Sequence, residues 1–96
     1  MKHERFIEIC KENVKLFENE RTDIDEKIQI DDVFTVWSCK TLQNSKCLMS
    51  TPVKGAYYYE FTLDGDKREI YMVVYKQVVN IHLDKDGDIL ELNNRG

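Results

Sequence analysis

The sequence has one proline and four glycines in 96 residues, which leaves little room for a linker or a low-complexity segment. No apolar run is long enough to span a membrane. The first residues, MKHERFIEICKEN, interleave charges with apolar side chains, unlike a secretory signal. Three cysteines are an odd number for a disulfide framework. These absences predict a single domain, residues 1–96, in the cytoplasm, with its cysteines kept as thiols and no membrane partner.

Charge is also missing from parts of the chain, although the formal net charge is −4. Residues 33–59 contain three lysines and no acid, whereas residues 23–32 and 84–91 are strongly acidic. Residues 22–67 contain no arginine, which argues against a nucleic-acid partner, as does the net negative charge. Solvated surface charge is the simplest interpretation of this distribution.

Residues 3–20 are predicted to form a helix. Phe6, Cys10, Val14 and Phe17 recur at spacings of four, four and three residues, which places them on one apolar face. Cys10 is expected to act there as a small buried hydrophobic residue.

The segment DDVFTVWSCKTL, residues 31–42, predicts a strand because it is rich in β-branched and aromatic residues. Apolar groups on both of its faces favour a position inside the sheet. A turn centred on Asn44 and Ser45 would place Cys39 opposite Ser50, so that Cys39 and Cys47 point to opposite faces and cannot form a disulfide.

Two further hairpins are expected. A turn at residues 65–66 would pair residues 56–63 with 68–77, and a bulge or bend is expected near residues 76–77. Asp86 and Gly87 mark the second turn, which is the strongest local hairpin pattern in the chain. The predicted cross-strand pairs are Phe61 with Ile70, Tyr59 with Met72, Thr62 with Glu69, Leu83 with Leu90, Ile81 with Leu92, and His82 with Glu91.

These elements predict an α+β fold, with an N-terminal helix packed on a mainly antiparallel five- or six-stranded sheet built from hairpins. The helix stripe is expected to cover the sheet face that carries Tyr57, Tyr59, Phe61, Ile70 and Met72.

No motif in the sequence compels a reaction, a cofactor or a metal. Asp84, Asp86 and Asp88 match the first acidic spacing of a calcium loop, but the residues that follow do not. Cys39 and His82 could form a nucleophilic pair, yet no flanking motif supports one. The prediction is therefore a protein without catalytic, cofactor-binding or metal-ligating residues. A small enzyme or metalloprotein remains an alternative, to be tested at Cys39.

The stretches DDVFTVWSCKTLQNSKCLMST and YYYEFTLDGDKREIYMVVYK resemble a family of small uncharacterised proteins encoded in phages and prophages of Gram-positive bacteria. The resemblance covers about residues 3–80 and is densest over 31–51. Alanine is expected in the family at the position of Cys47. The family has no assigned activity, so the resemblance implies only a setting: an accessory phage protein in the cytoplasm of an infected or lysogenic bacterial cell.

The predicted function is non-enzymatic: the protein binds, and inhibits or redirects, a host or phage protein. The expected surface is the solvent side of the sheet with Tyr58, Tyr71 and Tyr75, with Lys40 nearby and Trp37 as a core or interface anchor. A homodimer through the same face and a single-stranded nucleic-acid-binding module are the alternatives left open. The sequence does not identify the partner.

Overall fold

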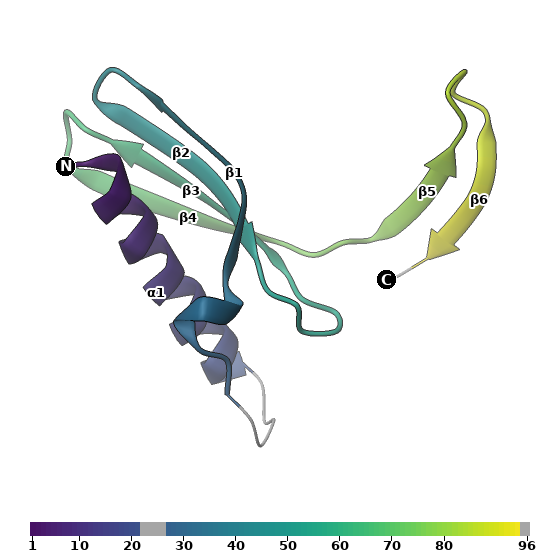
Figure 1. The fold of residues 1–96 in the computed structure, drawn as a ribbon, viewed down its shortest axis with the longest axis horizontal. Coiled ribbons are helices and arrows are strands. Elements are labelled where there is room, and N and C mark those ends of the chain that lie inside the picture. Colours follow the sequence, from purple (N-terminus) through teal and green to yellow (C-terminus); the bar gives the residue numbers. More distant parts are fainter. Residues whose placement is uncertain (22–26, 95–96) are drawn as a thin grey trace.

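The computed structural model describes residues 1–21 and 27–94, so three acids of the predicted acidic stretch, at positions 23, 25 and 26, lie outside the described residues. Figure 1 shows the order of the elements along the chain. They are α1 (His3–Arg21), the short 3₁₀ helix η1 (Ile30–Asp32), β1 (Phe34–Thr41), β2 (Asn44–Ser50), β3 (Tyr58–Asp64), β4 (Glu69–Tyr75), β5 (Val79–Leu83) and β6 (Ile89–Asn94).

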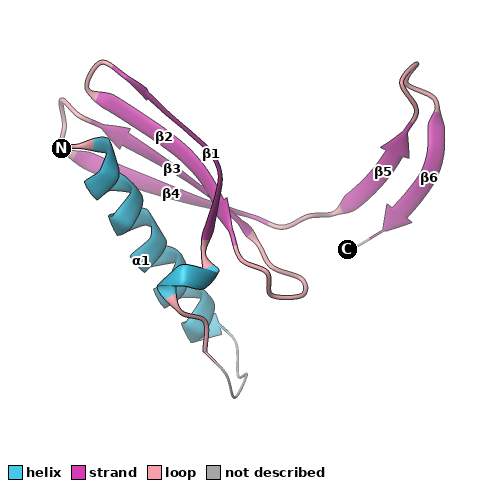
Figure 2. Ribbon diagram, viewed as in Figure 1, coloured by secondary structure: helices cyan, strands magenta, loops and turns pink. Residues whose placement is uncertain are grey.

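The fold is α+β, as the sequence predicts, but its strands form two sheets. Strands β1-β2-β3-β4 form an antiparallel sheet in chain order, and α1 packs on one face of it. Strands β5 and β6 pair with each other in a separate two-stranded sheet that extends away from the helix and the main sheet (Figure 2). We call this hairpin, residues 79–94, the arm. The expected single sheet of five or six strands is therefore a sheet of four strands plus the arm.

The core lies between α1 and the middle strands of the main sheet. Phe6, Cys10 and Val14 of the predicted helix stripe are fully buried, and the Phe17 ring meets the Tyr59 ring edge-on at a centroid distance of 5.8 Å. Each buried Phe or Val side chain stabilises the fold by about 1.5–3 kcal/mol relative to exposure. The sheet contributes Cys47, Met49, Tyr59, Phe61 and Leu63 to this core.

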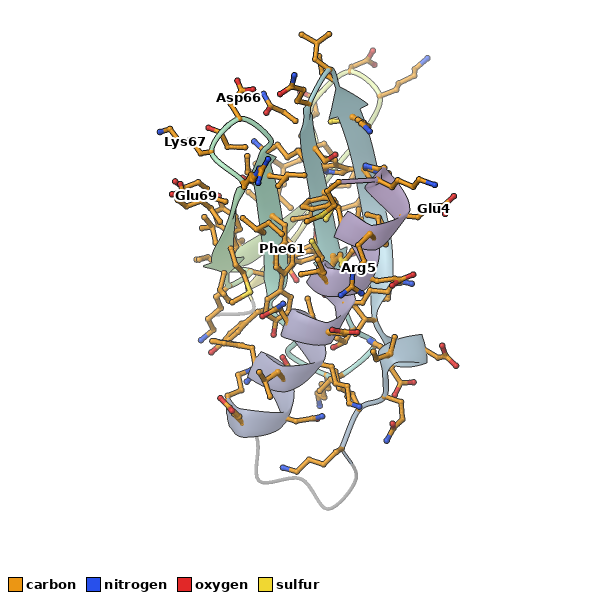
Figure 3. The ribbon with its side chains drawn as sticks, turned by 90° about the vertical axis from the view of Figure 1, so that its left-hand side faces the viewer. Glu4, Arg5, Phe61, Asp66, Lys67 and Glu69 are labelled. Carbon is orange, nitrogen blue, oxygen red and sulfur yellow. The ribbon has the colours of Figure 1, made fainter. Side chains whose placement is uncertain are left out.

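The helix covers less of the sheet than expected. It contacts β2 and β3, and Figure 3, which looks onto the helix side, labels Phe61 of β3 there. Ile70 is only partly buried and Met72 is 38% exposed, because β4 lies beyond the width of the helix.

Polar side chains hold both ends of α1 in place. At its start, the His3 ring nitrogens lie 3.2 Å from Ser45 Oγ and 3.3 Å from Ser38 Oγ. Near its end, the Asn19 side chain accepts a hydrogen bond from the Ile28 N–H at 2.9 Å and donates to the Ile28 carbonyl at 3.1 Å. Because Asn19 bonds both backbone groups of Ile28, the chain returning from the helix is fixed beside it.

The β1–β2 hairpin has a different register from the predicted one. Cys39 pairs with Lys46 and Thr41 with Asn44, so the turn is formed by Leu42 and Gln43 instead of Asn44 and Ser45. Leu42 has a φ of 57°, as tight hairpin turns require. Cys39 and Cys47 still point to opposite faces, so the prediction that they cannot bridge is confirmed, although the register behind it is wrong.

Strand β1 lies at the edge of the sheet, and the expectation of an interior position is wrong. Its register shifts between Thr35 and Trp37, which leaves a bulge at Val36. Bulges are common on edge strands because they twist the edge away from further pairing.

The β3–β4 hairpin keeps its predicted faces but has a longer turn. Phe61 pairs with Met72 and Tyr59 with Val74, which is two residues away from the predicted register. The turn comprises residues 65–68, where the Asp64 carboxylate accepts hydrogen bonds from the N–H groups of Asp66 and Lys67. A shift of two residues preserves which side chains share a face.

The arm is close to its predicted pairing at one end. Ile81 faces Leu92 and His82 faces Glu91 as expected, but Leu83 faces Ile89 instead of Leu90 because the register shifts there. The bend expected near residues 76–77 is a complete break between β4 and β5.

We predict that Gly65→Ala destabilises the main sheet. A Cβ atom at this position would lie 2.0 Å from the backbone oxygen of Gln43, because the β1–β2 and β3–β4 turns touch there. The strain should lower the free energy of unfolding by about 1–3 kcal/mol. Urea unfolding measures this difference. Asp66→Ala, in the same turn but exposed, is the control, and equal stability of the two variants would contradict the close contact.

Candidate binding face

The face of the main sheet opposite α1 collects aromatic and aliphatic side chains from all four strands. Because side chains alternate along a strand, each residue paired across the sheet shares a face with its partner. The pairings Trp37–Leu48, Leu48–Glu60, Glu60–Val73 and Tyr58–Tyr75 carry this face across the sheet. We call this surface the open face; its members are Trp37, Cys39, Lys46, Leu48, Tyr58, Glu60, Thr62, Tyr71, Val73 and Tyr75.

The apolar side chains of the open face remain exposed to solvent. Trp37 is 41% exposed, Tyr71 51%, Val73 45% and Tyr75 46%. An uncovered apolar surface of this kind typically marks an interaction site. The structure therefore brings together four of the five residues that the sequence points to, namely Trp37, Tyr58, Tyr71 and Tyr75.

Lys40 is the fifth predicted residue, and it does not lie on the open face. It pairs with Ser45, whose side chain points to the α1 side and contacts His3. Placing Lys40 near the tyrosines was wrong, because it stands at odd spacing from Trp37 along the same strand. Lys46 is the cation of the open face instead, and its Nζ lies 3.5 Å from a carboxylate oxygen of Glu60.

Tyr71 is held in place on the open face by its neighbour in the strand. Its hydroxyl donates a hydrogen bond to the Glu69 carboxylate, and this bond raises the pKa of Tyr71. The ring therefore has a fixed orientation while staying exposed, which reduces the side-chain entropy lost on binding a partner.

The cysteines form one buried pair and one exposed thiol. Cys10 of α1 and Cys47 of β2 are fully buried in the core, whereas Cys39 is exposed on the open face. A hydrogen bond between the Cys10 and Cys47 thiols, together with burial, raises the pKa of Cys10 far above its usual range. The only thiol positioned for chemistry in the described residues is thus Cys39.

The described residues bring together little that could perform a reaction. Cys39 lies in β1 and His82 in β5, which belong to different sheets. Residues 1–21 and 27–94 contain no group of three His, Cys, Asp or Glu side chains able to hold a metal ion. In the acidic turn of the arm, the Asp84 carboxylate accepts hydrogen bonds from the N–H groups of Asp86 and Asp88, each at 2.9 Å. These bonds give Asp84 a structural role in the hairpin.

A basic hollow of about 550 Å³ lies beside Tyr58, at one end of the open face. Its cationic lining comes from three segments: Arg21 at the end of α1, Lys54 in the β2–β3 loop and Lys76 after β4. Arg21 is positioned there by the Tyr57 ring, whose centroid lies 4.0 Å from its guanidinium carbon.

One buried polar cluster was missed by the sequence analysis. Glu18 is fully buried, accepts a hydrogen bond from the Tyr59 hydroxyl, and is bonded by Arg21 at 2.6 and 3.1 Å. Burial and the adjacent Glu18 carboxylate raise the pKa of Tyr59 above its ordinary value. Glu18 lies four residues after Val14, one turn further along α1. This spacing places it on the same buried stripe as Phe6, Cys10 and Val14.

Comparison with known families identifies one match. Residues 7–85 match the profile described as Family of unknown function (DUF6275). The chain belongs to this family. The DUF6275 match spans all of the main sheet and β5 and ends in the acidic turn, before β6.

Two further comparisons found nothing. No curated protein and no solved structure matches the DUF6275 chain significantly. Within the part of the chain that the structure describes, no helix combines the length and apolar character needed to cross a membrane.

We predict that Tyr59→Phe removes a pH-dependent part of the stability. Because the folded pKa of Tyr59 is raised, its contribution is complete below the unfolded value of about 10 and is lost as pH rises above it. At neutral pH the variant should be less stable by about 1–3 kcal/mol, since Glu18 loses a donor. The difference from wild type should shrink in alkaline solution, as measured by urea unfolding across pH. Tyr75→Phe, an exposed tyrosine, is the control and should show no such convergence.

We also predict that a maleimide modifies only Cys39 in the folded protein, because the Cys10 and Cys47 thiols are buried and hydrogen-bonded to each other. Mass spectrometry should show one adduct under native conditions and three in denaturant. Cys39→Ser should give none when folded. Rapid labelling of Cys10 in the native protein would contradict the packing of α1 on β2.

Proposed function

We propose that the protein is a non-enzymatic binding module whose open face receives a host or phage protein and inhibits or redirects it. The observation that carries this proposal is the exposed aromatic and aliphatic surface formed by Trp37, Tyr58, Tyr71, Val73 and Tyr75. Tyr and Trp dominate binding energy in protein interfaces because they bury a large area at a small entropic cost.

The composition of the open face fits a protein partner better than a small substrate. The Lys46–Glu60 ion pair lies among Leu48, Val73 and Tyr58, and apolar surface with few polar groups is typical of interface centres. The hollow beside Tyr58 lies at the end of this surface and is not enclosed by it.

We propose a phage or prophage setting in the bacterial cytoplasm. The resemblance of residues 31–51 to small phage and prophage proteins supports this setting.

We expect the double variant Tyr58→Ser/Tyr75→Ser to lose its partner. The two rings lie directly opposite each other on β3 and β4, and removing such anchors should weaken binding at least about tenfold. Affinity capture from infected or lysogenic cells, followed by titration of the retained protein, measures the loss. Leu16→Ser on the outer side of α1 is the matched control, since Leu16 is 59% exposed. A partner retained equally by all three proteins would contradict the assignment of the open face.

A single-stranded nucleic-acid-binding module is the second candidate, favoured by the basic hollow beside Tyr58. Arg21, Lys54 and Lys76 could contact phosphates while Tyr58 stacks on a base. Binding of a fluorescent single-stranded DNA or RNA, titrated with salt, tests it. The candidate requires affinity that falls steeply with salt and is lost in Lys54→Glu/Lys76→Glu, and it fails if no salt-sensitive binding is found at low ionic strength.

A further inference from the structure

The arm is amphipathic, and its apolar side is uncovered. By its pairing, Val79, Ile81, Leu83 and Ile89 share one face of the hairpin, whereas Asn80 and His82 share the other. Leu83 is 48% exposed and Ile89 67% exposed. A two-stranded hairpin without further packing is only marginally stable in water, so the arm needs a surface to cover its apolar side.

The molecule is too extended and too exposed for a chain of its length. Its radius of gyration is 15.7 Å, whereas a compact chain of this size has about 12.5 Å. Its accessible surface of 7122 Å² exceeds by about 1,300 Å² the area of about 5,800 Å² typical for a monomer of this mass. A standard interface buries about 800 Å² on each partner, so the excess is large enough to form one.

The arm and the open face both present uncovered apolar side chains, and the arm also carries an acidic turn. Residues 84–91 of the arm carry four acids and one lysine. Lys46 is the one cation among the open-face residues and lies 3.5 Å from Glu60, whereas Lys40 points to the α1 side of the sheet, so apolar burial carries the contact. Packing two arms together would instead bring two acidic turns close to each other, which is unfavourable.

The position of the arm allows an exchange between two molecules. In Figure 3, α1 stands in front of the main sheet and the arm lies behind it, and in Figure 1 the arm continues past the end of β4, away from α1. It is joined to β4 by only three residues, Lys76–Val78, and stays apart from the sheet in Figure 1. Two molecules related by a two-fold axis could therefore exchange arms. The arm of the first would cover the open face of the second, and the arm of the second would cover the open face of the first.

We propose that the protein forms a two-fold dimer in which the arm of each copy lies on the open face of the other. This inference rests on the open face of the proposed function but names a second copy of the chain as its occupant in the isolated protein, so that a host or phage protein would compete with the arm for this face. The contact covers Val79, Ile81, Leu83 and Ile89 of one copy with Trp37, Tyr71, Val73 and Tyr75 of the other.

Trp37 reports this contact without any substitution, since it is the single tryptophan of the chain and lies exposed on the open face. Sedimentation of the 96-residue protein should give twice the chain mass of 11.4 kDa. Across about a thousandfold dilution, the mass should fall to that of one chain while the Trp37 emission shifts to longer wavelength. A mass of one chain at every concentration overturns the proposal.

Two variants at exposed positions test the arm and the open face individually. Ile81→Asp alters the arm, Val73→Lys alters the open face, and Leu16→Lys on α1 is the matched control. Each of the first two should weaken dimerisation at least about tenfold, and the control should not. Circular dichroism and thermal melting establish that all three remain folded.

Mixing the two defective variants distinguishes exchange from other dimers. An equimolar mixture of Ile81→Asp and Val73→Lys retains one intact contact, between the arm of the second and the open face of the first, so heterodimers should form. A dimer through two open faces would survive Ile81→Asp alone, and an arm folded onto its own sheet would alter Trp37 emission at all concentrations without a change of mass. Either result overturns the proposal. If the protein is monomeric but Tyr58→Ser/Tyr75→Ser still loses a foreign partner, the proposed function stands and only the exchange fails.

Discussion

The packing of α1 on β2 and β3 is the contact on which the rest of the structure depends. A helix of 19 residues is about 28 Å long and about 10 Å wide, whereas four strands spaced about 4.8 Å apart span more than that width. One helix can therefore cover the middle of one face only. Phe6, Cys10 and Val14 close that side, and the bond of Glu18 to Tyr59 ties the far end of the helix to β3. Everything on the opposite face is left to solvent or to a partner.

The elements were predictable from the sequence wherever periodicity alone determines them. The spacing of Phe6, Cys10, Val14 and Phe17 predicts α1, and the alternation of Tyr59, Phe61 and Leu63 predicts the buried side of β3. Registers were less predictable, because a shift of two residues leaves every side chain on its face, and the length of a turn decides between such shifts. Strand β1 was predicted inside the sheet because apolar groups on both faces are typical of an interior strand. It lies at the edge instead, and Trp37 and Cys39 are exposed on the open face.

The candidate site was predictable to the same extent. Tyr58, Tyr71 and Tyr75 share a face by strand alternation and by the antiparallel pairing of β3 and β4, and both could be inferred. The spacing of Glu18 after Val14 indicates that it lies on the buried side of α1, but its hydrogen bond could not be inferred, because its donor, Tyr59, lies 41 positions away. The basic hollow was equally hidden, since Arg21, Lys54 and Lys76 come from three separate segments that only the fold brings together.

The contact between an arm and an open face joins two different surfaces, and such contacts can propagate from molecule to molecule into open filaments. A closed dimer forms only when both arm–face contacts of a pair are made at once. Each arm must then hold one orientation relative to its own sheet. The connection of only three residues between β4 and β5 restricts that orientation. The bulge at Val36 disfavours further pairing at the β1 edge, and the acidic turn keeps arms from stacking on one another. These features direct association through the faces of the sheet and oppose growth at its edges. The exposed apolar surface is therefore compatible with a discrete assembly.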